Sequence, residues 1–136
     1  MQQEIILISD PKVLAIPIRE NDELLIDLQK VAYLFVDLSR ENVQKTSPAI
    51  SFVRKTVADM LLKAQSKLPN GYKFMIKEGQ RDIETQRKIF DEYKDFLKKE
   101  FPNLSEEELH KKVSAYAAPP ETVPPHSTGG AVDLTL

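Results

Sequence analysis

The 136-residue chain contains no cysteine and no tryptophan, and its only histidines are His110 and His126. Without cysteine, neither a disulfide framework nor a thiolate zinc site can form. A transition-metal site in this chain must therefore use histidine and carboxylates, and a three-histidine site is excluded. The chain also lacks a strong excess of either charge, because 19 basic residues are interleaved with 21 acidic ones. This balance argues against a nucleic-acid partner.

Long apolar runs are missing as well. No stretch approaches the roughly 18 apolar residues of a membrane span, so we expect no transmembrane segment. The N-terminus has no basic segment and no small-residue cleavage site, which is unlike a signal peptide. We expect a cytoplasmic protein, or a periplasmic one if a signal was removed before residue 1. The length favours a single domain over residues 1–136.

The apolar pattern predicts an α+β fold with a small, mainly antiparallel sheet, two long helices and one short helix. Strands are predicted near residues 5–8, 31–38 and 72–77, where apolar and β-branched residues concentrate. Turn residues such as Asp10-Pro11 follow the first of these runs.

Two apolar stripes at helical spacing predict the long helices. The first covers about residues 47–67 and begins at Ser47-Pro48, where serine suits the cap and proline the first turn. The second covers about residues 83–101. Its opposite face is charged, and we assign that face no function.

A short helix is predicted over about residues 105–115. Ser105 and Glu108 form a capping-box pattern at its start. His110 lies on this helix among charged residues, so we interpret it as an exposed helix residue and not as a metal ligand.

The strongest chemical pattern lies in the last eleven residues, which begin at His126. The proline-rich segment Ala117–Pro125 precedes it and is either a surface linker or a stiff arm that presents His126. Imidazole and carboxylate are common zinc ligands, so His126 and Asp133 are candidates for a metal site. The simpler alternative is a loop histidine and a strand aspartate with ordinary hydrogen-bond partners.

A strand is predicted after Gly129-Gly130, with alternate side chains on opposite faces. One face would carry Ala131, Asp133 and Thr135. The other would carry Val132, Leu134 and Leu136 and pack on a core. Asp133 could then point into a site.

The string H-x-x-G-x-A-x-D, followed by Leu-Thr-Leu, resembles the first metal-binding motif of the zinc D-alanyl-D-alanine dipeptidases. These enzymes are related to the D,D-carboxypeptidases and to the hedgehog signalling domain. The motif positions are His126, Gly129, Ala131 and Asp133. The resemblance implies a hedgehog/D,D-peptidase-like fold and one zinc ion held by His126, Asp133 and a third histidine.

A second segment with the same resemblance lies where a predicted strand passes into a predicted helix. Arg81 and Gln86 resemble the R-x(4)-Q pattern of the family, although Gln80 and Asp82 stand where the family usually has tyrosine and proline. The resemblance implies that Arg81 stabilises the negative oxygen of the tetrahedral intermediate. A permanent cation with several donors suits that role.

The remaining substrate contacts are predicted less directly. Gln86 is a candidate through the same pattern, and Glu78 could orient Arg81 or shape the pocket. The family commonly has a serine two positions before the ligand histidine, where this chain has Pro124. Ser127 is the nearest hydroxyl that could replace it.

The resemblance implies zinc-dependent hydrolysis of D-alanyl-D-alanine, in peptidoglycan precursor turnover or glycopeptide resistance. The family takes its third zinc ligand and its general base from a downstream E-x-x-H motif, whereas this sequence stops at Leu136. We therefore expect a truncated domain that binds zinc poorly and hydrolyses slowly or not at all. We also expect an unpaired edge strand, which self-association or the missing C-terminal segment would cover.

Two alternatives remain open. One is a related D,D- or L,D-carboxypeptidase of the same fold with another substrate. The other is a non-catalytic binding module that retains the fold.

Overall fold

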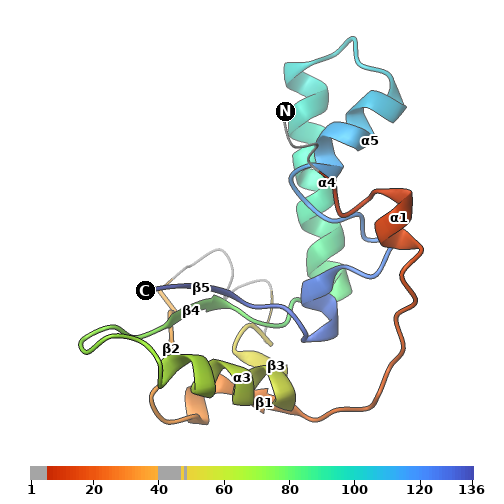
Figure 1. Cartoon of the computed structure of the whole chain (residues 1–136). Coiled ribbons are helices and arrows are strands. Elements are labelled where there is room, and N and C mark those ends of the chain that lie inside the picture. Colours follow the sequence, from red (N-terminus) through yellow and green to blue (C-terminus); the bar gives the residue numbers. More distant parts are fainter. Residues whose placement is uncertain (1–5, 40–46, 48) are drawn as a thin grey trace, which may run out of the picture. The chain divides into compact units, whose positions relative to one another are not determined.

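The computed structural model describes residues 6–39, 47 and 49–136. It has a mixed α and β composition, with four α-helices and two small sheets among these residues (Figure 1). The chain divides into two compact units. One comprises the residues up to Arg19 together with Gln86–Pro124, and the other comprises Glu20–Thr85 together with Pro125–Leu136.

The Glu20–Thr85/Pro125–Leu136 unit contains both sheets. Strand β1 (Leu25–Asp27) pairs antiparallel with β3 (Phe52–Arg54). In the second sheet, β4 (Met75–Glu78) lies between β2 (Phe35–Val36), its parallel neighbour, and β5 (Asp133–Thr135), its antiparallel neighbour. The described strand pairings are therefore mainly antiparallel, as predicted.

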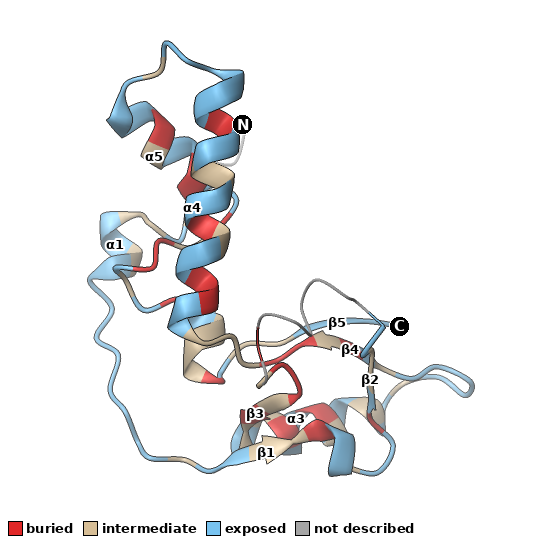
Figure 2. Ribbon diagram, turned by 180° about the vertical axis from the view of Figure 1, so that it is seen from behind, coloured by how far each residue is buried: buried red, intermediate tan, exposed pale blue. Residues whose placement is uncertain are grey.

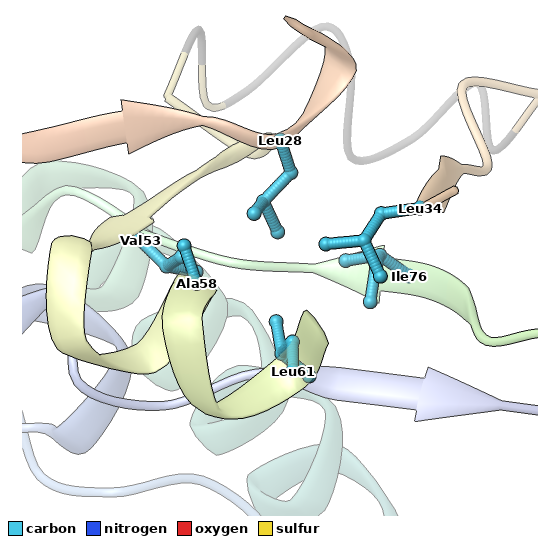
Figure 3. Close-up of a cluster of buried hydrophobic side chains, with 6 residues drawn as sticks. All are labelled: Leu28, Leu34, Val53, Ala58, Leu61 and Ile76. Atoms are coloured by element: carbon cyan, nitrogen blue, oxygen red, sulfur yellow. The ribbon is translucent and has the colours of Figure 1, made fainter. Parts of the chain in front are cut away.

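Helix α3 (Lys55–Gln65) packs its apolar face against these strands. Figure 3 shows the core between them, in which the buried side chains come from strands, helix and connecting segments. They are Leu28, Leu34, Val53, Ala58, Leu61 and Ile76.

The first long helix begins later than predicted. Residues 52–54 form β3 instead of the helix's early turns, because β3 pairs with β1 and buries Val53 completely. The hydroxyl of Ser51 supports this pairing by donating to the Asp27 carboxylate at 2.8 Å. Helical spacing of apolar residues did not distinguish the two conformations, and tertiary pairing decided between them. Pro48, predicted in the first turn, lies outside the described residues.

The other unit is built on α4 (Ile83–Glu100), from Gln86 onwards, and on α5 (Glu106–Ser114). Both helices were predicted within a residue or two. The predicted capping box is confirmed, because each of Ser105 and Glu108 accepts the other's backbone amide through its side chain. The buried side chains of this unit form their own cluster, and Figure 2 marks buried positions in red along both helices. They are Phe90, Leu97, Leu109, Val113 and Ala117.

The strand predicted near residues 5–8 is not observed at Ile6–Ile8, while Ile5 lies outside the described residues. A four-residue helix, α1 (Pro11–Leu14), follows instead. Asp10 caps it by accepting the Lys12 amide at 2.8 Å, and Pro11 occupies the first turn. Cap and proline chemistry therefore explain the helix.

Candidate metal site

His126 lies in a short 3₁₀ turn, Pro125–Thr128, directly before the predicted glycine bend. The Thr128 hydroxyl donates to the Pro125 carbonyl at 2.7 Å and accepts the Gly130 amide at 3.0 Å, which closes the turn. Gly129 has φ +70°, and a Cβ there would lie 2.7 Å from the Leu25 side chain. The positive φ favours glycine at this position, and a Cβ there would also require the Leu25 side chain to shift.

The imidazole of His126 is oriented by a backbone carbonyl. Its Nδ1 lies 2.8 Å from the Gly79 oxygen, and a carbonyl can only accept, so Nδ1 carries the proton in this contact. Neutral His126 therefore presents the Nε2 lone pair. A metal-ligating histidine is commonly fixed in this way through its other nitrogen.

Nε2 of His126 lies 3.5 Å from Oδ1 of Asp133 on β5. That separation is long for a hydrogen bond. Tetrahedral zinc, with ligand distances of about 2.0–2.2 Å, would separate two of its ligand atoms by about 3.3–3.5 Å. The two donors predicted from the sequence are therefore brought together at a separation that fits one shared ion.

Arg81 lies beside the same turn. Its backbone N–H donates to the His126 carbonyl at 3.0 Å. Its guanidinium donates to both carboxylate oxygens of Glu78, from Nε at 2.7 Å and from Nη2 at 2.6 Å. The contact anticipated between Glu78 and Arg81 is present, and both side chains belong to the corner that holds His126.

Glu78 is register-paired with Asp133 across β4 and β5. A register shift between Ile76 and Glu78 interrupts the strand alternation there. Such an irregularity re-aims a side chain. It places Glu78 opposite Asp133 although Ile76, two residues earlier, is opposite Leu134.

The C-terminal strand only partly matches its predicted faces. Val132 packs against the core, as expected. Leu134 and Leu136 remain 39% and 63% exposed, so the prediction that they pack on a core is wrong. All three residues of β5 are exposed, so little of the described chain covers this strand.

Ser127 and Gln86, the other predicted substrate contacts, differ in their surroundings. Ser127 lines a polar hollow of about 310 Å³ together with the side chains of Glu20, Asp22, Glu23, Leu25, Arg54, Gln80 and Thr128. Gln86 is buried, belongs to the helical unit and donates to the Ala118 carbonyl at 2.7 Å. Its observed contact supports the loop after α5.

His110 lies on α5, as predicted, but it is half-buried rather than simply exposed. Its Nε2 is 2.9 Å from the Glu121 carboxylate, and its Nδ1 is 3.4 Å from the Ser114 hydroxyl. These contacts join the helix to the proline-rich segment. They explain His110 without a metal.

Asp82, which stands where the motif resemblance would put a proline, directly precedes α4. Its carboxylate accepts the Thr85 amide at 2.8 Å and the Thr85 hydroxyl at 2.7 Å. Burial raises the pKa of Asp82, but hydrogen bonds from Thr85 and Ser47 outweigh it and leave this pKa below its usual value. Asp82 therefore supplies a helix cap.

Sequence reasoning missed the contribution of Gly79. Its carbonyl orients His126, and its amide donates to the Ile50 carbonyl at 2.6 Å. A Cβ at position 79 would lie 2.9 Å from the Ile50 oxygen and closer still to that of Phe52. The signal available in the sequence was a glycine at the end of a strand, which indicates a close backbone approach.

Within residues 6–39, 47 and 49–136, no three or more acidic or histidine side chains group closely enough to hold a metal ion. Among these residues the candidate site offers two possible ligands, His126 and Asp133. In the same part of the chain, no helix is long and apolar enough to cross a membrane.

Comparison with known proteins found no matching family model, no matching curated protein and no matching solved structure.

Proposed function

We propose that this chain forms the first metal-binding half of a zinc-dependent dipeptidase site that acts on D-alanyl-D-alanine. The observation that supports it best is the pair of His126 Nε2 and Asp133 Oδ1, 3.5 Å apart, with Nδ1 already engaged by the Gly79 carbonyl. The donors are of the types zinc prefers, and their spacing fits a shared ion.

In this proposal, His126 and Asp133 hold the metal. Bound zinc supplies a Lewis acid that polarises the scissile carbonyl and lowers the pKa of a bound water. Arg81 supplies the permanent positive charge for the oxygen that becomes negative during hydrolysis. The third ligand and the general base would come from the E-x-x-H motif that the resemblance implies.

The substrate class rests on the resemblance in the two motifs, since the described geometry does not select a peptide. A D,D- or L,D-carboxypeptidase would use the same ligands and the same arginine. A non-catalytic module is the second candidate, favoured by the presence of only two ligands among the described residues.

The test is release of D-alanine from D-alanyl-D-alanine, measured with zinc and with a chelator. The preparations are the 136-residue chain alone and the chain supplied with a segment that carries E-x-x-H. We expect chelator-sensitive release in the second preparation and little or none in the first. L-alanyl-L-alanine serves as the stereochemical control, and acylated tripeptides identify a carboxypeptidase.

Release from acylated tripeptides but not from the free dipeptide would assign the carboxypeptidase alternative. Absence of release from every peptide, with zinc bound, would contradict the enzyme proposal and favour the binding module.

A further inference from the structure

The corner between β4 and α4 is held by four contacts that involve its backbone. The amides of Gly79 and Gln80 donate to the carbonyls of Ile50 and Phe52 at 2.6 and 2.7 Å. On its other side, the Arg81 amide donates to the His126 carbonyl, and the Gly79 carbonyl contacts the His126 ring. The Cα of Arg81 is therefore fixed relative to His126.

A fixed backbone does not fix a guanidinium, because arginine has four rotatable side-chain bonds and loses considerable rotamer entropy when ordered. Glu78 removes this freedom through two parallel charge-assisted hydrogen bonds, which define the plane of the guanidinium as well as its position. The Glu78 side chain is only 5% exposed, and that of Arg81 is 17% exposed. Little solvent competes with the pair.

Glu78 is also placed next to the second candidate ligand. It is the last residue of β4 and is register-paired with Asp133 of β5, after a register shift that follows Ile76. The partner of Arg81 and the candidate ligand Asp133 therefore lie at paired positions of neighbouring strands.

We propose that Glu78 is a positioning residue that holds the Arg81 guanidinium beside the His126/Asp133 metal site. The proposal rests on the proposed function for its substrate, but its geometric part concerns only residues of this chain. Glu78 would neither bind the metal nor contact the peptide. Its carboxylate would set where the positive charge of Arg81 is available.

The first measurement concerns the pair itself and requires no metal. In protein labelled with ¹⁵N-arginine, we expect a slowly exchanging Nε–H signal from Arg81, assigned through Arg81→Lys. Glu78→Gln and Glu78→Asp should both lose this slow exchange, since the first removes the charge and the second withdraws the carboxylate by one methylene. Glu84→Gln, the same chemical change at an exposed position of α4, should retain the signal.

The second measurement concerns the consequence for an anion. A phosphinate analogue of D-alanyl-D-alanine, which presents a tetrahedral anion, is titrated into the zinc-saturated chain. We expect both Glu78 variants to lower the affinity for the analogue by about tenfold to a hundredfold, because the positive charge of Arg81 would no longer be held in place. Zinc affinity should change by less than about twofold, because Glu78 is not a ligand.

Each other outcome has a separate meaning. Unchanged analogue affinity in the Glu78 variants, with a loss in Arg81→Lys, would overturn the positioning role alone. A loss of zinc affinity in Glu78→Asp would also overturn it, by showing that Glu78 acts on the metal. If the original chain binds neither zinc nor the analogue, the proposed function fails, and the Arg81 Nε–H exchange then decides whether Glu78 holds the guanidinium. If the Glu78→Gln protein does not fold, the same measurements on Glu78→Asp decide whether Glu78 positions Arg81.

Discussion

At the scale of single residues, the candidate site depends on backbone groups as much as on side chains. The Gly79 carbonyl selects the tautomer of His126, and the Arg81 amide binds the carbonyl of the same histidine. These contacts hold the imidazole of the candidate ligand in one orientation. A substitution that moves the corner should therefore affect the site without removing a ligand.

Gly79→Ala is the most direct test of that corner. The added Cβ would collide with the carbonyl oxygens of Phe52 and Ile50, which are held in place by the amides of Gln80 and Gly79. We expect the free energy of unfolding to fall by about 1–3 kcal/mol, as for overpacking. The measurement is urea denaturation followed by circular dichroism.

Gly71→Asn is the matched control. Position 71 has φ +91°, a Cβ added there would have no atom within 4 Å, and asparagine tolerates positive φ better than other residues. We expect a change within about 0.5 kcal/mol. Equal losses in the two variants would contradict the account of Gly79.

The sequence grouped His126, Asp133 and Arg81, and the structure brings His126 next to Asp133 and next to the backbone of Arg81, but the individual contacts were not predictable. That the histidine and the aspartate hold a metal stays a prediction. The contact between Arg81 and Glu78 was anticipated as one of two roles for Glu78. The Gly79 carbonyl carries no side-chain signal, so its part in the site required the fold.

At the scale of elements, local signals located helices better than strands. Capping chemistry identified α5, and a long amphipathic stripe identified α4, because both patterns depend on neighbouring residues. Strand β3 was predicted as helix because its evidence lies in its distant partner β1. Short strands that are defined by long-range pairing are therefore the part of this fold least accessible from sequence.

The capping box of α5 gives a prediction at this scale. Ser105→Ala removes the hydroxyl that accepts the Glu108 amide and should destabilise the helix by about 1 kcal/mol. Amide hydrogen exchange in α5 should rise accordingly. Ser66→Ala, which removes an exposed hydroxyl that donates to the Lys63 carbonyl after α3, is the control and should leave α5 unchanged. Unaltered exchange in Ser105→Ala would contradict the assigned cap.

The segment before β1 is attached to β3 through charge. Arg54 at the end of β3 donates to both carboxylate oxygens of Glu20 at 2.8 and 2.7 Å. These bonds, with the amides of Asp22 and Asn21, lower the pKa of Glu20 from 4.5 to about 2. Because the folded pKa is lowered, the stabilisation is present above pH 4.5 and is lost as pH falls towards 2.

The Glu20 prediction can be measured as a titration of its side-chain carboxyl carbon by NMR. We expect a midpoint near pH 2 in the original chain and a return towards 4.5 in Arg54→Gln. Added salt should raise the midpoint in the original chain, since the pair is exposed to screening ions. A midpoint near 4.5 without substitution would contradict the contact.

At the scale of the whole molecule, the two units have separate buried clusters. Ile76 is fully buried in one cluster, and Leu109 is almost fully buried in the other. Neither cluster shares a buried residue with its counterpart. The single domain predicted over residues 1–136 stays a prediction, and core substitutions can test it.

Ile76→Ala and Leu109→Ala should each cost about 2–5 kcal/mol in their own cluster. We expect amide protection to fall mainly in the unit that carries the substitution, as judged by native-state hydrogen exchange. If either variant lowers protection equally in both units, the chain unfolds as one cooperative domain. That outcome would contradict independent clusters.

The central claim is that His126 and Asp133 form one metal-binding pair, and zinc titration calorimetry tests it most directly. We expect weak binding of one zinc ion by the original chain, with the binding lost in His126→Gln and reduced at least about tenfold in Asp133→Asn. His110→Gln, the same change at the other histidine, should bind zinc like the original chain. Loss of binding in His110→Gln, or equal binding in His126→Gln and the original chain, would contradict the account.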